Sequence, residues 1–204
     1  MEVKLCNISK RYRYQWILKD VNHTFESGLM VGIKGPNGSG KSTLMKMTAG
    51  FLSPTSGKVS YLYDEQVITK DKMFAYISFV APYTQLIREF TIKEQFDFHF
   101  RFKRAAHKGD WSAFSSFFDF TISQNKRIEN YSSGMNQRLQ LALALWSDSP
   151  LLLFDEPTAY LDEMARAWFY DQLEKFTPKR TVIIASNDHR DLELAHSSVD
   201  VREL

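Results

Sequence analysis

One short stretch combines glycines, a lysine and two hydroxyl residues in an order suited to phosphate binding. It reads GPNGSGKST and fits the pattern G-x-x-x-x-G-K-[ST]. An apolar run, residues 29–33, precedes it and predicts a strand, and helical spacing follows from Lys41 to Gly50. Between a strand and a helix, the loop N–H groups and the helix N-terminus can surround phosphate oxygens, Lys41 can neutralise the β- and γ-phosphates, and Ser42 can bind Mg²⁺. The predicted phosphate-binding residues are Gly35, Asn37, Gly38, Ser39, Gly40, Lys41, Ser42 and Thr43.

Two acids end a second apolar run, LLLFDE, at residues 151–156. Four apolar residues predict a buried strand that delivers both carboxylates to the edge of a sheet, where ligands bind in α/β folds. We expect Asp155 to hold Mg²⁺ through water and Glu156 to orient a water for attack on the γ-phosphate. The alternative for Glu156 is a helix cap or an ion pair.

A third apolar run, residues 181–185, ends in the polar segment Ser186-Asn187-Asp188-His189. Either Asn187 or His189 could face a ligand at the same sheet edge. Asp188 or Ser186 can cap a following helix, which would put His189 in its first turn.

Strands that alternate with helices along the 204 residues predict an α/β fold with a largely parallel core sheet, as one domain or a domain with a subdomain. The net charge of +2 gives little support for nucleic-acid binding, so we expect no nucleic-acid partner. Cys6 is the single cysteine, which excludes an internal disulfide. The sequence has no apolar run of about 18 residues of the kind that spans a membrane.

The segment KEQFDFHFRFK, residues 93–103, alternates as a strand would. On a helix, Phe96 and Phe100 would share one face, and Phe98 and Phe102 a nearly opposite one. Periodicity alone leaves both interpretations open.

Four motifs together resemble the nucleotide-binding subunits of ATP-binding cassette (ABC) transporters: GPNGSGKST, YSSGMNQR at 131–138, LLLFDEPTAYLD at 151–162 and TVIIASND at 181–188. YSSGM is similar to the family signature LSGGQ. The resemblance implies a P-loop NTPase core with a mainly parallel sheet, an N-terminal antiparallel β subdomain and an inserted helical subdomain. In that scheme residues 1–81 and 147–204 form the core and β subdomain, and about 82–146 form the helical subdomain. It also favours a helix for residues 93–103.

In this family two subunits enclose two ATP molecules head to tail. The resemblance implies that the signature residues Ser132, Ser133, Gly134 and Met135 contact the γ-phosphate on the other subunit, and that Asp162 lies at the dimer interface. Ser133 and Met135 replace a glycine and a glutamine of the signature. Tyr12 matches the aromatic that stacks on adenine, with Tyr14 and Trp16 as alternatives.

Two positions depart from the family pattern. The family glutamine that contacts Mg²⁺ and the membrane partner falls nearest Pro82, and Gln85 lies three residues on as a candidate for that role. The family histidine that contacts the γ-phosphate corresponds to Asn187, whose amide can donate a hydrogen bond but cannot carry a proton near neutral pH. By this register Asn187 is the expected γ-phosphate contact, and His189 is a solvated residue.

The resemblance implies a MgATP-hydrolysing subunit on the cytoplasmic face of a membrane, working as a homodimer or heterodimer with a separate transmembrane permease. We expect reduced but measurable hydrolysis. The alternatives are a degenerate module that binds ATP with little hydrolysis, and an ABC ATPase without a transport role. We further hypothesise that one aromatic face of residues 93–103 lines a groove for a permease helix; the alternative is that both faces are buried.

Overall fold

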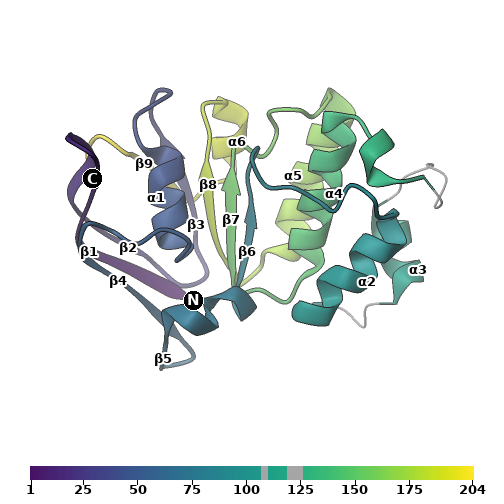
Figure 1. The fold of residues 1–204 in the computed structure, drawn as a ribbon, viewed down its shortest axis with the longest axis horizontal. Helices are drawn as coiled ribbons and strands as arrows, with labels where there is room; N and C mark the ends of the chain where they lie inside the picture. Colours follow the sequence, from purple (N-terminus) through teal and green to yellow (C-terminus); the bar gives the residue numbers. More distant parts are fainter. Residues whose placement is uncertain (107–109, 119–125) are drawn as a thin grey trace.

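The chain folds into two sheets with a group of helices to one side (Figure 1). The computed structural model describes residues 1–106, 110–118 and 126–204. The expected fold, a P-loop NTPase core with an antiparallel sheet and an inserted helical part, is confirmed. No helix within the described ranges is long and apolar enough to cross a membrane.

The elements are β1 (Glu2–Tyr12), β2 (Gln15–Phe25), β3 (Met30–Lys34), α1 (Lys41–Thr48), β4 (Ser56–Tyr63), β5 (Gln66–Ile68), a 3₁₀ helix (Lys70–Ala75), β6 (Ile77–Val80), α2 (Ile92–Phe102), α3 (Trp111–Phe118), a 3₁₀ turn (Ile128–Asn130), α4 (Ser133–Trp146), β7 (Leu151–Asp155), α5 (Glu163–Phe176), β8 (Thr181–Ala185), α6 (His189–Glu193) and β9 (Ser197–Asp200).

The core sheet is parallel and has the strand order β6-β7-β8-β3-β9. Every residue of β7 and β8 is buried, which explains why both strands are continuous apolar runs rather than alternating ones. Because β7, β8 and β3 are neighbours, their carboxyl ends meet at one edge. The three polar segments found in the sequence therefore lie side by side.

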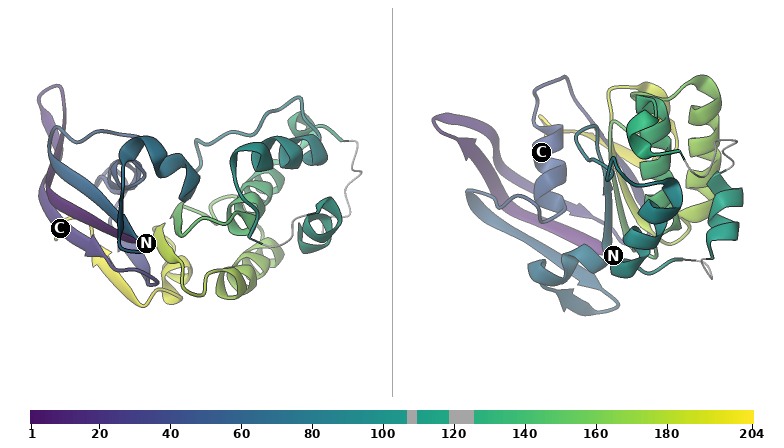
Figure 2. Two further views of the ribbon diagram at one scale, coloured as in Figure 1. Left: turned by 90° about the horizontal axis from the view of Figure 1, so that it is seen from below. Right: turned by 45° about the vertical axis from the view of Figure 1, so that its right-hand side comes forward.

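The second sheet is antiparallel, with the order β2-β1-β4-β5. Helix α1 lies between it and the parallel sheet, so both sheets and α1 share one hydrophobic core (Figure 2). Leu44 and Met45 of α1 are fully buried there. The helix ends as expected, since Gly50 takes a φ of 76° just beyond it. This packing fixes the start of α1, and with it the phosphate loop.

Some boundaries differ from the sequence-based expectation. Strands β1 and β2 are 11 residues each, because bulges at Asn7 and Asp20 (φ 48° and 52°) let the pairing continue where the alternation breaks. The strand expected from Ala75 begins at Ile77, since Ala75 closes the 3₁₀ helix.

Residues 92–102 form the helix α2, which resolves the ambiguity of the alternating phenylalanines. A capping box starts it: Thr91 accepts from the Glu94 N–H, and the Glu94 carboxylate accepts from the Thr91 N–H. Phe96 is 5% exposed, whereas Phe98 is 39% and Phe102 62% exposed. The alternative in which both aromatic faces are buried is therefore wrong.

A third face of α2 carries His99, whose Nε2 lies 2.9 Å from the Ser147 hydroxyl oxygen. That hydroxyl donates to the Leu143 carbonyl, so His99 Nε2 carries the proton in this pair. Burial, reinforced by the charge of Lys103, lowers the pKa of His99 to about 4. In the unfolded chain His99 binds a proton as pH falls through about 6.5, whereas in the folded chain it stays neutral until pH nears 4.

His99 should therefore make the fold acid-sensitive. Its contribution is complete above pH 6.5 and is lost as pH falls towards 4; at pH 5 the loss is about 2 kcal/mol. The free energy of urea unfolding, measured from pH 7.5 to 5.0, should fall less steeply for His99→Gln, which keeps an N–H donor. His189→Gln is the control, because that side chain is 91% exposed. Parallel pH profiles for wild type and His99→Gln would contradict the assignment.

Candidate active site

The phosphate loop joins β3 to α1 at the carboxyl edge of the core sheet. Gly38 has a φ of 81°, and a Cβ placed there would meet nothing within 4 Å, so the loop is open towards a ligand at this point. Gly40 is the N-cap residue of α1 with a φ of 105°. The loop lines one cavity together with Tyr12 and Glu156. The cavity is bounded by Tyr12, Ile17, Pro36, Asn37, Gly38, Gly40, Lys41, Ser42, Thr43 and Glu156.

Lys41 is the centre of this site. Its side chain is only 6% exposed, and its ammonium donates to the Gly35 carbonyl at 2.6 Å and to Asn187 Oδ1 at 3.0 Å. Glu156 Oε1 lies 3.9 Å from the ammonium. The lysine thus links the loop after β3 to the segments that follow β7 and β8.

Asp155, the last residue of β7, is 1% exposed. Its Oδ2 accepts from the Tyr83 hydroxyl at 3.2 Å, while Oδ1 is buried and has no hydrogen-bond partner in the described part of the chain. Burial raises the pKa of Asp155; Ser42, Tyr83 and Lys41 oppose that shift. An unpartnered buried carboxylate oxygen beside a hydroxyl is a chemically suitable place for a hard cation such as Mg²⁺, so the residues present fit that ion.

Glu156 leaves the strand with a φ of 49°, a left-handed conformation that is uncommon for glutamate and turns the chain at the sheet edge. Its N–H donates to the Ala185 carbonyl at 2.7 Å. The carboxylate accepts from the Asn187 N–H at 3.4 Å. It also lies 3.2 Å from the Ser186 hydroxyl oxygen, whose single hydrogen has a closer acceptor in Asp191 at 2.6 Å. Burial raises the pKa of Glu156, whereas the hydrogen bond from the Asn187 N–H and the charge of Lys41 act to lower it. The Glu156 side chain is therefore positioned by the residues that follow β8, while it lines the cavity.

Asn187 spans the site. Its amide oxygen accepts from Lys41, and its amide nitrogen donates to Asn37 Oδ1 at 2.6 Å. The nitrogen carries two hydrogens, so one remains for a ligand. His189 points elsewhere: it is 91% exposed and contacts Glu193 at 3.3 Å, while Asp188 caps α6. The structure thus brings Asn187, and not His189, to the phosphate loop.

Tyr12 is the aromatic that lines the cavity, at 48% exposure and with the Lys10 ammonium 5.3 Å from its ring centre. Tyr14 and Trp16, on the same hairpin, are not among the lining residues. Of the remaining loop residues, Ser39 has a buried hydroxyl with no partner among the described residues.

The signature residues lie at a different surface. Ser132, Ser133, Gly134, Met135 and Asp162 line a second cavity that shares no lining residue with the first. Ser132 caps α4 by accepting from the Met135 N–H at 3.2 Å, and Asp162 caps α5 by accepting from the Ala165 N–H at 2.8 Å. Within one chain, the signature does not reach Lys41.

Gly134 is constrained by close packing. A Cβ there would lie 2.6 Å from the Tyr160 carbonyl oxygen, in the loop that follows Glu156. This contact holds the N-terminus of α4 against the chain between Glu156 and Asp162.

Gly134→Ala should therefore lower the free energy of unfolding by about 1–3 kcal/mol, because a backbone carbonyl must move. Urea unfolding measures the change. Ser133→Ala, one residue earlier at an exposed position, serves as the matched control. If Gly134→Ala is as stable as this control, the close contact with Tyr160 is not a constraint.

Gln85 does not reach the acids. It is exposed and lines other cavities, whereas Tyr83 supplies the contact with Asp155. The structure thus gives no support for Gln85 as a metal contact. Sequence reasoning missed Tyr83, because nothing in the sequence says which side chain of the 81–85 loop turns towards β7.

Asp191 was also missed. It is 1% exposed and accepts from Ser186 at 2.6 Å, Thr158 at 2.9 Å and Tyr170 at 2.8 Å. These bonds hold Ser186 in position beside Glu156. A buried carboxylate with hydroxyl partners from three separate segments has no local sequence signal.

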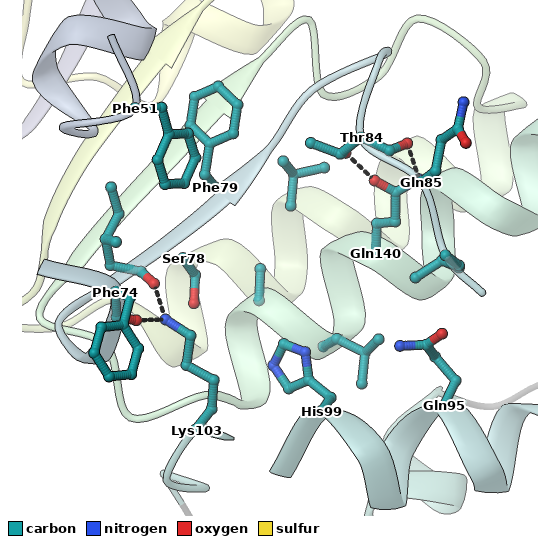
Figure 3. A pocket seen from close by; sticks show the side chains of 15 residues that line it. Phe51, Phe74, Ser78, Phe79, Thr84, Gln85, Gln95, His99, Lys103 and Gln140 are labelled. Carbon is teal, nitrogen blue, oxygen red and sulfur yellow. Dashed lines mark hydrogen bonds between the residues drawn. The ribbon is translucent and has the colours of Figure 1, made fainter. Parts of the chain in front are cut away.

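A groove runs between β6 and the helices α2 and α4 (Figure 3). Gln95 and His99 of α2, with Lys103 just after the helix, point into it from one side. Phe51, Phe74 and Phe79 form the other side. Lys103 donates to the carbonyls of Phe74 and Ile77. Phe98 and Phe102 are exposed and are not among the residues that line this groove. The hypothesis that this aromatic face receives a permease helix therefore stays a prediction.

Comparison with known proteins agrees with this geometry. The family described as ABC transporter matches residues 18–159. The chain is 31% identical over 195 residues to the Nod factor export ATP-binding protein I of Rhizobium johnstonii, covering 94% of this chain and 63% of that protein. It is 35% identical over 195 residues to a probable metal transport system ATP-binding protein of Thermotoga maritima, covering 91% and 75%.

A solved structure is similar over nearly the whole chain. It is a dimeric ATP-binding cassette in a post-hydrolysis state, bound to ADP and Pi. The TM-score is 0.83 at 26% identity, with 97% of this chain and 93% of that chain covered. With the matched family, the relatives and the shared fold in agreement, the chain belongs to the ABC transporter family.

Proposed function

We propose that this chain is an ATP-binding and ATP-hydrolysing subunit of an ABC transporter that powers a separate transmembrane permease. One observation carries the proposal: Lys41 and Glu156 line one cavity with the phosphate loop, and Asn187, from the segment after β8, bonds to both of them. The chain spans 63% of the length of the Rhizobium relative, so activity, cargo and partners are proposed here on the chemistry of the site.

ATP would lie with its phosphates on the loop 35–43 and its base near Tyr12. Lys41 would exchange its bond to the Gly35 carbonyl for bonds to phosphate oxygens, since charged acceptors bind an ammonium more strongly. Ser42 and Asp155 would hold Mg²⁺, which when bound supplies positive charge to the β- and γ-phosphates.

Glu156 would orient the attacking water and accept a hydrogen bond from it. Its carboxylate is already directed by the Asn187 N–H and lies against Ser186, so little reorganisation is needed. Asn187 would donate its free N–H to a γ-phosphate oxygen. It supplies a donor but no titratable proton, which is why we expect hydrolysis that is slow but measurable.

The signature of a second subunit would complete the site. In Ser132 the hydroxyl oxygen accepts the capping bond, which leaves the hydroxyl hydrogen available to a phosphate. The first turn of α4 adds N–H groups and partial positive charge. A head-to-tail pair, homodimeric or heterodimeric, would bring this surface and Asp162 onto the partner's ATP.

The groove between β6 and α2–α4 is the proposed docking site for a permease segment, and the subunit would then work on the cytoplasmic face of the membrane. Support comes from its apolar lining, with Phe51 at 62% and Phe74 at 59% exposure. Phe98 and Phe102 form no part of this proposal.

A second candidate function is a module that binds ATP with little hydrolysis. Asn187 in place of a histidine favours it, as does Gln85, which lies exposed and away from Asp155. The steady-state ATPase rate of the purified chain distinguishes the two functions.

Glu156→Gln should abolish ATP hydrolysis without loss of binding. We expect kcat to fall about 100-fold or more, because the amide cannot accept a proton from water. The ATP dissociation constant should change less than about twofold, since the side chain keeps its shape. Both are measured against Glu174→Gln, a remote exposed glutamate on α5. An unchanged ATPase rate would refute the assigned role and the proposed hydrolysis.

Asn187→His should retain or raise the ATPase rate, because imidazole offers an N–H donor at the same place together with a titratable proton. His189→Ala should change the rate little, as its side chain lies in solvent. Steady-state kcat for both variants is the measurement. The reverse pattern would mean that His189, and not Asn187, serves the phosphate.

A further inference from the structure

The turn that follows β6 brings one side chain to the buried acid of the site. Ala81, Pro82, Tyr83 and Thr84 form a tight turn, closed by the Thr84 N–H on the Ala81 carbonyl at 3.0 Å. The Thr84 hydroxyl reinforces it by donating to the same carbonyl at 2.7 Å. Pro82 occupies the second position of the turn, where its fixed φ is favoured. The turn therefore sets the direction of Tyr83 and leaves Gln85 beyond it.

Tyr83 reaches from this turn to β7. Its hydroxyl donates to Asp155 Oδ2 at 3.2 Å. The ammonium of Lys46, on α1, lies 3.9 Å from the centre of its ring. A phenol is protonated at neutral pH, so its hydroxyl is the donor and the carboxylate the acceptor. The tyrosine is thus held between a cation and the carboxylate.

The same bond defines the state of Asp155. Tyr83 occupies Oδ2, while the other oxygen, Oδ1, is buried with no partner among the described residues. The Ser42 hydroxyl is near enough to the same carboxylate to lower its pKa. A donor to one oxygen of a ligating carboxylate fixes its rotation and leaves the second oxygen for the ion.

We propose that Tyr83 is a positioning residue that orients Asp155 for the metal of the nucleotide complex, through the turn shaped by Pro82. The proposal rests on the proposed function, since it concerns the MgATP site. The side chain that contacts Asp155 from this turn is thus Tyr83, and neither Pro82 nor Gln85 makes that contact.

The test compares Tyr83→Phe, which removes the hydroxyl and keeps the ring, with Tyr63→Phe, which removes a phenolic hydroxyl on β4 away from the site. Mn²⁺ affinity for the protein–ATP complex is measured by electron paramagnetic resonance. ATP affinity without metal, in EDTA, and the thermal midpoint are measured alongside. Tyr83→Phe should weaken Mn²⁺ binding about 10-fold, leave metal-free ATP binding unchanged and match Tyr63→Phe in thermal midpoint.

The outcomes separate the two proposals. Mn²⁺ affinity in Tyr83→Phe equal to that of Tyr63→Phe would overturn the role of the hydroxyl, and so would a loss of metal affinity seen in Tyr83→Ala alone, which would assign the effect to the ring. Equal loss of ATP binding with and without metal would assign Tyr83 a general structural role and would also overturn the proposal. A wild-type chain that binds no ATP would overturn the proposed function itself, and this inference with it.

Discussion

The burial of one ammonium group, that of Lys41, is the constraint on which the site depends. A charge that is 6% exposed must be satisfied by nearby acceptors, and here they are the Gly35 carbonyl and the Asn187 amide, with Glu156 close by. These groups come from the loops after β3, β8 and β7. They can meet because the three strands are parallel neighbours with their carboxyl ends at one edge. The strand order thus supplies the acceptors that offset the cost of burying the lysine. The hydrogen bonds of Lys41 in turn connect the loop after β3 to the segment after β8.

The two surfaces that the proposed function requires are separate within one chain yet joined by a short backbone contact. The signature helix α4 faces a cavity distinct from that of Lys41. Its Gly134 lies against the Tyr160 carbonyl, four residues after Glu156. A shift of the acid-bearing loop would therefore be felt at the N-terminus of α4.

Backbone strain and buried polar groups gather at the same edge. Glu156 takes a left-handed conformation, and Asp155 keeps a buried oxygen without a partner in the described part of the chain. Asp191, by contrast, is fully occupied by three hydroxyls and steadies Ser186 beneath Glu156. The supporting carboxylate, Asp191, has hydrogen-bond donors on both oxygens, whereas Asp155, which we propose binds an ion, keeps one oxygen free of hydrogen bonds from the described residues and able to bind it. That contrast is what distinguishes a supporting residue from a candidate ligand.

Local pattern predicted the α/β fold, the phosphate loop and the paired acids, because each depends on apolar runs of fixed length, glycine spacing, or residues that directly follow a strand. The choice of Asn187 over His189 came from the register of the four family motifs. Three points follow from the folded chain and not from local pattern. Tyr83 rather than Gln85 contacts Asp155, and Tyr12 rather than Tyr14 or Trp16 lines the cavity. Gln95 and His99 of α2, with Lys103 just after it, line the groove. The reason is physical. The direction of a side chain in a turn, and the face that a helix presents, are set by contacts with segments distant in sequence, here β7, the phosphate loop and β6.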